Sequence, residues 1–597
     1  MFNFPIPKPR LFIAALAALL FISGRELFAQ DPELKFNLDI SSATVPLPKI
    51  FKPSVDLSGR GFHRQMSWPQ GLAAPEALDA WQKDIGFPGI YRLQYNLWEI
   101  YQLAKNKQAQ SRLLANYEDI IKRVSDAGGV VILDIFGSPP GLGKVLDKKS
   151  PPVNLRAFKE IIKEHIRYLS CDKRYNIWYE VWTAPDVDDF FLGRKQEYLN
   201  LYRTVAEAIK ELEAQVKIHI PVGGPAISAW FQNIDPNNVL TPEHSLIYDL
   251  IRFCYGYHLP LDFISWHAFS TAPAPGKEMT IYDKPMISLI RAWLTYFKFD
   301  SKTPLIVDEW NYDRGGNVLT ERGEQAYVSA SYVPARIKNM HEAGLDYQVY
   351  FSLEDFQDNR EGVVRNTGVF WFDSESSGYK GGCKATYNVF RMLSELGNNM
   401  FSPADNTQDE FVGAIATKSN GAIIVLVYNY IDPDIASNFI SQDIATFNSS
   451  ERQFILNLIK SDKLSNIIKG EVDVGSLRTT KDVKNLLNKA KELNNLADKF
   501  KSAPRNIKIA IKKLNGTYTY QRYGVDESCG LSCKYAPVEE KEFTTSDIYE
   551  ETLATNPYSV NMIILKPKPK EPEITGTTAG QEPTEQDAGN VVTTNKQ

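Results

Sequence analysis

The central part of the chain alternates short apolar runs with longer segments of helical periodicity. The runs are nearly continuous, as is typical of parallel strands that are buried on both faces. Between them, apolar residues recur three or four positions apart, as in residues 111–127, which predicts amphipathic helices. The seven runs are Ile90–Asn96, Val130–Phe136, Ile177–Trp182, Ile218–Val222, Phe263–His267, Leu305–Glu309 and Tyr347–Phe351.

An eighth strand is expected near Gly59–Arg64, so that strand and helix alternate eight times over residues 55–375. This length and rhythm predict an α/β fold, a (β/α)8 TIM barrel. A doubly wound sheet is the alternative. It is disfavoured because no glycine-rich phosphate loop follows the first strand.

The regions that flank the predicted barrel have the two-residue alternation of half-buried strands. Residues 30–54 are expected to contribute an N-terminal strand, Leu34–Ile40, to an accessory β-sandwich formed by residues 376–566. Turns at Asn420-Gly421 and Asn515-Gly516 predict two hairpins. The strands expected after the barrel are Val412–Thr417, Ala422–Tyr428, Ile507–Ile511, Thr517–Tyr520 and Ser559–Leu565.

A helical insertion is expected to interrupt the sandwich at about residues 450–505. Apolar residues from Val483 to Phe500 trace one helix face, and Thr479 is the candidate N-cap. Packing of this helix onto the sandwich is favoured over a role in binding a partner protein. Residues 567–597 are rich in Pro, Thr, Glu and Gln, which predicts a disordered tail.

The N-terminus has the architecture of a signal peptide. Lys8 and Arg10 precede an almost wholly apolar stretch, residues 11–22, and Ala29 offers a cleavage point. We therefore expect residues 1–29 to be removed and the protein to be exported, to a periplasm or outside the cell. A retained N-terminal anchor is the alternative. No later stretch reaches the ~18 apolar residues of a membrane span, so we expect none after cleavage.

Composition narrows the classes of partner. The 597 residues include 67 Lys and Arg against 72 Asp and Glu, a net charge of -5, so no basic excess favours a nucleic-acid partner. Five cysteines are too few for a disulfide scaffold. Cys529 and Cys533 are read as a disulfide or as two free thiols. We expect no metal and no cofactor, because no cluster of metal ligands is visible, and the sequence predicts no particular oligomeric state.

Carboxylates and indoles gather at the predicted strand ends, where barrels of this kind place their reactive groups. Glu309 ends the seventh strand, His267 the sixth, and Glu354 follows the eighth. A cleft with a carboxylate floor and indole walls suits a carbohydrate, although a single tryptophan is more often part of a core. The tryptophans at or just past strand ends are Trp98, Trp182, Trp230, Trp266, Trp310 and Trp371.

Several of these segments resemble glycoside hydrolase family 39, over roughly residues 35–440. The segments that carry the resemblance are Tyr179–Gly193, Phe263–His267, Leu305–Asn311 and Tyr387–Leu393. The resemblance implies a retaining hydrolase of O-glycosidic bonds in a poly- or oligosaccharide. By that likeness Glu309 is the nucleophile and His267 a neighbour on the sixth strand. By the same likeness, Arg92 matches the basic residue that the barrels of this clan carry low on the second strand.

The chain departs from the family at the fourth strand. The family pattern there is Trp-Asn-Glu-Pro, with Glu as acid/base, whereas this chain has Trp182-Thr183-Ala184-Pro185. A general acid/base contributes about 10²–10⁴-fold, so the loss at Ala184 predicts weak or altered activity.

Other carboxylates of the chain are candidate substitutes for the missing acid. Asp186 and Glu354 are the substitute acids considered, with Asp188 and Asp189 on the same loop as Asp186. For each, a structural role is favoured. Glu180 is on the same face of the strand, but at about 3.3 Å per residue it lies ~13 Å deeper than position 184. It is therefore too far away to replace the missing acid.

Two functions follow from this pattern. One is a glycosidase that uses Glu309 weakly or in an altered reaction such as transglycosylation. The other is a catalytically silent carbohydrate-binding protein, a pseudoenzyme. Each site residue also has a structural interpretation: Glu309 as a structural carboxylate, Arg92 as an ion-pair member, His267 and the indoles as core. The residues expected to bind substrate are Arg92, Trp98, Trp182, Thr183, Trp266, His267 and Trp310.

Overall fold

A computed structural model provides the structure of the chain. It describes residues 34–569, apart from 60–67, 229–244, 270–283, 312–325, 359–362, 374–379, 404–406, 408, 462 and 531–532. The expected signal peptide, residues 1–29, and nearly all of the expected tail, residues 567–597, lie outside the described residues. Among the described helices, none has the length and apolar character needed to cross a membrane.

Seven parallel strands form the central sheet, and a short extended segment closes it into a barrel. Residues 54–58 lie between the first and the last strand, where Val55 bridges Tyr350 and Asp56 bridges Arg92. The amide of Asp56 donates to the Tyr350 carbonyl at 2.8 Å, and that of Leu57 to the Arg92 carbonyl at 2.9 Å. The strands, in sheet order, are β3 (Ile90–Asn96), β4 (Val130–Phe136), β5 (Ile177–Val181), β6 (Val222–Ile227), β7 (Phe263–Phe269), β8 (Leu305–Asn311) and β9 (Tyr347–Tyr350). The predicted barrel is confirmed.

Two strand positions differ from the sequence prediction. The closing segment is 54–58 rather than 59–64, and residues 60–64 lie outside the described residues. The fifth barrel strand, β6, spans Val222–Ile227 rather than residues 218–222. Its glycines and proline suggest a turn, yet Gly223 lies so close to β7 that a Cβ there would be 2.3 Å from the Phe263 carbonyl oxygen. Close approach of the β6 and β7 backbones, rather than a turn, therefore accounts for the glycine at position 223.

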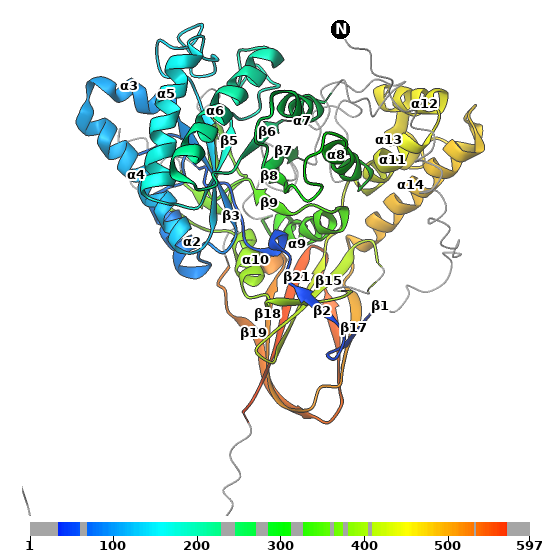
Figure 1. Cartoon of the computed structure of the whole chain (residues 1–597). Coiled ribbons are helices and arrows are strands. Elements are labelled where there is room, and N and C mark those ends of the chain that lie inside the picture. The colour runs from blue at the N-terminus through cyan, green and yellow to red at the C-terminus, as the bar shows by residue number, and fades with distance from the viewer. Residues whose placement is uncertain are drawn as a thin grey trace, which may run out of the picture.

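Helices surround the sheet, as Figure 1 shows. The helix predicted for residues 111–127 begins earlier, at Lys107, because the Asn106 side chain caps it by accepting from the Ala109 amide at 3.1 Å. The helices of the barrel region are α2 (Pro75–Asp84), α3 (Leu97–Gln102), α4 (Lys107–Asp126), α5 (Leu155–Ile166), α6 (Lys195–Val216), α7 (Leu246–Tyr257), α8 (Lys284–Tyr296), α9 (Ala326–Ala343) and α10 (Ala385–Ser394). Two small hairpins, β10 (Phe356–Asp358) with β11 (Val363–Arg365) and β12 (Phe370–Phe372) with β13 (Gly381–Cys383), follow β9.

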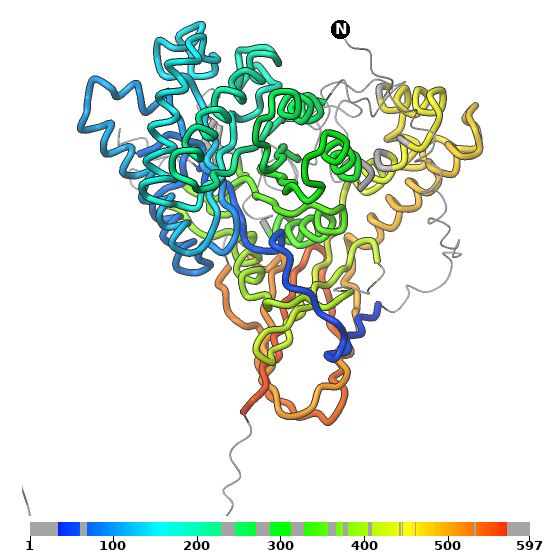
Figure 2. The backbone as a smooth tube through the Cα atoms, viewed as in Figure 1, coloured from blue at the N-terminus to red at the C-terminus, as the bar shows by residue number. Residues whose placement is uncertain are grey.

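A β-sandwich packs below the barrel in the view of Figure 1. Its smaller sheet has the order β1 (Leu34–Asp39), β17 (Arg505–Lys512), β20 (Ile548–Thr555). Its larger sheet has the order β19 (Pro537–Thr545), β18 (Gly516–Val525), β21 (Ser559–Pro567), β16 (Ala422–Asn429), β15 (Val412–Ser419), β14 (Asn399–Phe401), β2 (Thr44–Pro46). The N-terminal strand β1 pairs in parallel with β17, so it lies in the sandwich, and the chain then runs to the barrel (Figure 2).

One predicted hairpin is wrong. β15 and β16 pair as expected around Asn420-Gly421, but β17 and β18 belong to different sheets. The reason lies in the connection between them, where Leu514 is fully buried in the core that the two sheets share. Burying this side chain takes the chain across the core instead of folding it back along one sheet.

The helical insertion comprises α11 (Ile435–Asp443), α12 (Ser449–Lys460), α13 (Lys463–Ile468) and α14 (Lys481–Phe500), beside the barrel in Figure 1. The N-cap of α14 is Thr480, one residue after the expected Thr479. The predicted apolar face of α14 is buried, but much of it packs against α11, α12 and α13 in a core of the insertion's own. The end of the helix contacts the sandwich, where Phe500 meets Phe411. A disulfide joins Cys529 and Cys533.

Candidate active site

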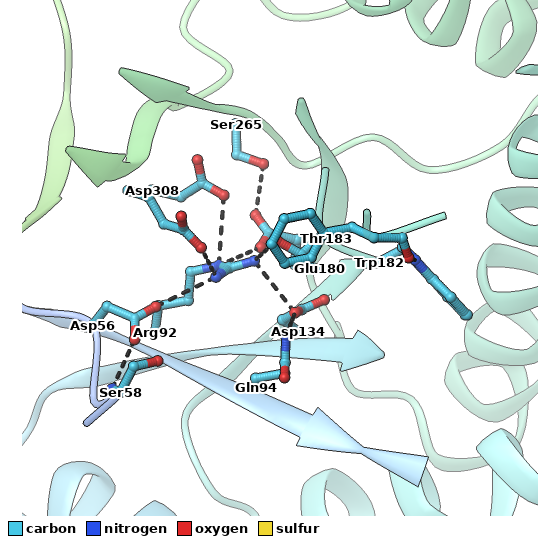
Figure 3. A network of polar contacts seen from close by, with 12 residues as sticks. Asp56, Ser58, Arg92, Gln94, Asp134, Glu180, Trp182, Thr183, Ser265 and Asp308 are labelled. Carbon is cyan, nitrogen blue, oxygen red and sulfur yellow. Dashed lines mark hydrogen bonds and ion pairs between the residues drawn. The ribbon is translucent and has the colours of Figure 1, made fainter. Parts of the chain in front are cut away.

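One buried arginine organises the interior of the barrel. Arg92 extends from β3 with a side chain only 2% exposed, and its guanidinium forms ion pairs with carboxylates from four parts of the sheet. Figure 3 shows four of the carboxylates, those of Asp56, Asp134, Glu180 and Asp308, around it. The paired oxygens are those of Asp56 at 3.3 Å, Asp134 at 3.3 Å, Glu180 at 2.7 Å, Asp308 at 3.5 Å and Glu309 at 2.6 Å. The ion-pair interpretation of Arg92 is therefore confirmed.

A bulge in β8 allows two neighbouring acidic residues to reach the same guanidinium. Trp266 of β7 is paired with Val307 of β8, but His267 is paired with Glu309, so Asp308 is an extra residue in β8. Side chains normally alternate between the two faces of a strand, and a bulge locally breaks this alternation. As a result Asp308 and Glu309 both face Arg92.

Glu309 is the carboxylate of this group that reaches solvent. Its side chain is 15% exposed, whereas those of Arg92 and its other four carboxylate partners are between 0% and 2% exposed. Arg92 Nη1 donates to Oε1, and Nδ1 of His267 lies 3.4 Å from Oε2. The structure thus brings together three of the predicted site residues, Arg92, His267 and Glu309.

The carboxyl groups of Asp134, Asp308 and Glu309, which pair with Arg92, have raised pKa values. Burial raises the pKa of Glu309 to about 8: Arg92 opposes the shift, and the charges of Asp56 and Asp134 add to it. Burial likewise raises the pKa of Asp134 to about 7 and that of Asp308 well above its usual range. Burial opposes the charge of Arg92, but the surrounding carboxylates hold its pKa well above the usual value. Near neutral pH, protons are therefore distributed among these three carboxyl groups.

The end of β5 approaches the same guanidinium without an acidic side chain. Thr183 is buried, and its hydroxyl accepts from Arg92 Nη2 at 2.9 Å. Ala184 is also buried, has a φ of +42°, and donates its amide to the Ala226 carbonyl at 2.8 Å. Thr183 is thus anchored to Arg92 in the barrel interior, and Ala184 is anchored to β6.

Three tryptophans that were expected in a cleft wall lie in the core. Trp182, Trp266 and Trp310 are 0% exposed. Trp266 and Trp310 neighbour inward-facing His267 and Glu309, so strand alternation turns their indoles toward the helices. The indole of Trp310 donates to Gln348 Oε1 at 2.6 Å, and that of Trp182 to the Phe190 carbonyl at 3.0 Å. Trp98 and Trp371 are partly exposed, and Trp230 lies outside the described residues.

The carboxylates considered as substitute acids have structural partners. Asp186 accepts from the amide of Ser228 at 2.8 Å and from its hydroxyl at 2.7 Å, which ties the loop after β5 to the end of β6. Glu354 is fully buried and accepts from the Ala74 amide at 3.1 Å, just before α2. Asp188 and Asp189 are exposed on the loop after β5. Glu180 lies beneath, where it accepts from the Ser265 hydroxyl at 2.6 Å.

Sequence reasoning missed Asp56, Asp134 and Asp308 as members of this network. Asp56 bridges Arg92 directly across the closing segment, and Asp134 pairs in register with Gln94, two residues from Arg92. Strand alternation could have assigned these inward positions, because Asp134 and Asp308 lie two residues after Ile132 and Ile306 of the barrel interior. The bulge leaves no such signal for Glu309. Within the described residues, no group of His, Cys, Asp and Glu is arranged to hold a metal ion.

Comparison with known proteins identifies the family. Residues 145–445, just over half of the 597, match the model of glycosyl hydrolases family 39. The chain belongs to this family. The match includes Thr183, Ala184, His267 and Glu309.

Two curated relatives are β-xylosidases. The one from Caldicellulosiruptor saccharolyticus is 25% identical over 306 residues, which are 48% of this chain and 55% of the relative. The one from Geobacillus stearothermophilus is 25% identical over 301 residues, 47% of this chain and 53% of the relative. The chain thus spans about half the length of the curated relatives that it matches.

Solved structures share the fold over most of the chain. A glucosidase from Croceicoccus marinus superposes with a TM-score of 0.59 at 14% identity, over 90% of this chain and 100% of that chain. A monomeric β-xylosidase from Caulobacter crescentus gives 0.57 at 15% identity, over 89% and 99%. Family 39 structures of this kind combine a TIM barrel with a β-sandwich, as this chain does.

Proposed function

We propose that this protein is an exported glycoside hydrolase-like enzyme that attacks O-glycosidic bonds of a poly- or oligosaccharide with Glu309 as nucleophile. The observation that carries the proposal is the position of Glu309 at the end of β8. It is the one carboxylate among the five paired with Arg92 that reaches solvent to a marked extent. Membership of family 39 supports glycosidic bonds as the target, and the predicted signal peptide supports export.

The surroundings of Glu309 act in opposite directions on the charged form that a nucleophile needs. In a retaining mechanism a carboxylate oxygen attacks the anomeric carbon, and the enzyme forms a covalent glycosyl ester. Arg92 donates to one oxygen and stabilises the carboxylate, both before attack and when water later releases it. Burial and the neighbouring acids oppose ionisation, so the reactive form becomes abundant only as pH rises through the pKa of Glu309, about 8.

The second half of the usual carboxylate pair is absent from position 184. Resemblance to the family assigns the acid/base to this position, where the chain has a buried alanine. We infer that the leaving-group oxygen departs without protonation by the enzyme. The first step should then be slow on poor leaving groups and should favour acidic aglycones. The second step should favour acceptors that need no base.

A second function is favoured by the same end of β5. Thr183 and Ala184 are buried and anchored, and neither can donate a catalytic proton. A catalytically silent protein that only binds carbohydrate would need no acid at this position. In that case Glu309 is a structural and ligand-contacting carboxylate.

Azide distinguishes the two functions. We expect the protein to hydrolyse a 2,4-dinitrophenyl glycoside slowly, and azide to accelerate turnover because it attacks the glycosyl-enzyme without needing a general base. The glycosyl azide formed should keep the anomeric configuration of the substrate. Absence of any azide product across a panel of glycosides, or a product of inverted configuration from the wild-type protein, would contradict a nucleophilic Glu309.

A further inference from the structure

Gln94 is, like Glu309, an inward-facing residue of the barrel that reaches solvent. It lies on β3 two residues after Arg92, so strand alternation turns it to the same side as the guanidinium. Gln94 is partly exposed, whereas the side chain of Arg92 is 2% exposed. On the neighbouring strand β4 its register partner is Asp134. Gln94 therefore lies nearer than Arg92 to the C-terminal end of the strands, where Glu309 is also partly exposed.

Short contacts connect Gln94 to Glu309. Nε2 of Gln94 donates to Oδ2 of Asp134 at 3.5 Å, and that oxygen lies 3.3 Å from Nη2 of Arg92. Nη1 of the same guanidinium lies 2.6 Å from Oε1 of Glu309. Figure 3 shows Asp134 between Gln94 and the guanidinium. Because only one carboxylate and one guanidinium separate them, Gln94 and Glu309 can contact the same sugar unit.

The Asp134 carboxylate determines which end of the Gln94 amide faces solvent. A glutamine amide has a donor end, Nε2, and an acceptor end, Oε1. An ionised carboxylate only accepts hydrogen bonds, so it takes the Nε2 end. Oε1 has no donor among the described residues and is not sealed from solvent. Gln94 thus presents a hydrogen-bond acceptor to whatever binds above it.

Asp134 ionises at a lower pH than Glu309. Burial raises the pKa of Asp134 to about 7 and that of Glu309 to about 8. A rise in pH through this range therefore ionises Asp134 first and Glu309 next. The groups that act on Asp134 are Arg92 and Gln94 from β3, Glu180 from β5 and Asp56 from the closing segment. When Glu309 is charged and able to attack, Gln94 therefore presents Oε1.

The charge around Glu309 opposes an acidic sugar. In the reactive state Glu309 and Asp134 are both ionised, and they share the single positive charge of Arg92. A carboxylate on the sugar would add a further negative charge to this group. It would also meet Oε1 of Gln94, which accepts but cannot donate. A hydroxyl group avoids both costs, because it is neutral and can donate.

Resting on the proposed function, we propose that Oε1 of Gln94 accepts a hydrogen bond from a hydroxyl group of the sugar that Glu309 attacks, and that this sugar is neutral rather than a uronic acid. Gln94 is then a substrate-binding residue that contributes to specificity. A site that hydrogen-bonds a hydroxyl group disfavours the analogue that lacks it, because the acceptor of the protein is then left unpaired.

Monodeoxy competitors test the hydrogen bond. The protein is labelled at about pH 9, above the pKa of Glu309, with the 2-deoxy-2-fluoro glycosyl fluoride that reacts there. The methyl 1-thioglycoside of the same sugar, or one of its monodeoxy derivatives, competes. Loss of the hydroxyl group that Gln94 binds should weaken protection about fivefold or more. In Gln94→Met, which keeps the length of the side chain but removes the amide, that derivative and the parent should protect within about twofold.

A matched control and an acidic competitor complete the test. Gln82→Met makes the same change at an exposed glutamine of α2 that bonds Arg123, and should keep the wild-type pattern. The methyl 1-thioglycoside of the corresponding uronic acid should protect the wild-type protein about tenfold less well than that of the neutral sugar, or worse.

The outcomes separate this proposal from the proposed function. Equal losses from every deoxygenation in Gln94→Met and in the wild-type protein, with Glu309 still labelled, would overturn the role of Gln94 and leave the proposed function standing. Better protection by the uronic acid derivative would do the same. Failure of every sugar, neutral or acidic, to label Glu309 would overturn both.

Discussion

The ends of β8 and β5 face the same guanidinium but offer it different chemistry. At β8, Arg92 Nη1 donates to Glu309, a carboxylate that is 15% exposed and has His267 beside its second oxygen. At β5, Arg92 Nη2 donates to Thr183, a buried hydroxyl that is followed by a buried alanine. Under the proposed function, the end of β8 would attack an anomeric carbon, and the end of β5 would not protonate the leaving group.

The largest effect is expected from returning an acid to β5. Ala184→Glu should raise turnover of an alkyl glycoside of the sugar that labels Glu309 by about 10²–10⁴-fold. Ala184 already has a Cβ at a φ of +42°, so the new side chain adds no further backbone strain. Turnover would be followed by release of free sugar.

Ala184→Gln is the control, because glutamine has the size of glutamate but carries no acidic proton. A gain of the same size in Ala184→Gln would mean that shape and not acidity limits the reaction. No gain in either variant, in a folded protein, would remove the missing acid as the cause of weak activity.

A large loss of stability is expected when the shared guanidinium is removed. Arg92→Met leaves five neighbouring carboxylates without their cation, and should cost about 3–5 kcal/mol in the free energy of unfolding at neutral pH. Urea denaturation measures this cost. It should shrink at lower pH, where the carboxyl groups are protonated. Arg203→Met is the control, because its partner Glu207 is exposed, and should cost about 1 kcal/mol or less.

The pH dependence of labelling should report on Glu309. Its pKa is raised to about 8, and only the carboxylate can attack, so labelling by a 2-fluoro glycosyl fluoride should increase with pH. Between about pH 6 and pH 9 the ionised fraction rises about 100-fold for such a group. Asp134→Asn removes a nearby negative charge and should move the midpoint to lower pH. The exposed Asp126→Asn should leave it in place, and a rate that does not change with pH would exclude Glu309 as the titrating nucleophile.

The smallest effect is expected at Asp186. Both of its oxygens accept hydrogen bonds from Ser228, so we expect it to hold the loop after β5 and not to protonate an aglycone. Asp186→Asn should then change turnover of a poor substrate by less than about threefold, within the range of a surface substitution. A loss of a hundredfold or more on alkyl glycosides, with little loss on dinitrophenyl glycosides, would make Asp186 the missing acid and end the contrast between the two strands.

The barrel could be predicted from the sequence because buried parallel strands leave nearly unbroken apolar runs, as in Val130–Phe136. The same logic failed at Val222–Ile227, where glycine and proline reflect close backbone approach to β7 rather than a turn. The turn signal at Asn515-Gly516 also failed to predict how β17 and β18 pair, because the burial of Leu514 depends on a sheet that is distant in sequence.

The site was predictable only where a motif marked it. Glu309, His267 and Arg92 lie together, as expected from their strand ends and the family resemblance. Asp56, Asp134 and Asp308 had no motif around them, although Asp308 lies two residues after inward-facing Ile306. The bulge then brings Glu309 to the same side of the strand. The indoles of Trp266 and Trp310 were expected in a cleft, but strand alternation next to inward-facing His267 and Glu309 directs them into the core.

The most direct test of a nucleophilic Glu309 is intact-mass labelling with a panel of 2-deoxy-2-fluoro glycosyl fluorides, whose fluoride leaves without an acid. We predict one sugar adduct per chain in the wild-type protein, located on Glu309 by peptide mapping, and no adduct in Glu309→Gln. An adduct on another residue, or none from any sugar while a polysaccharide still binds, would contradict the account and favour a protein that only binds carbohydrate.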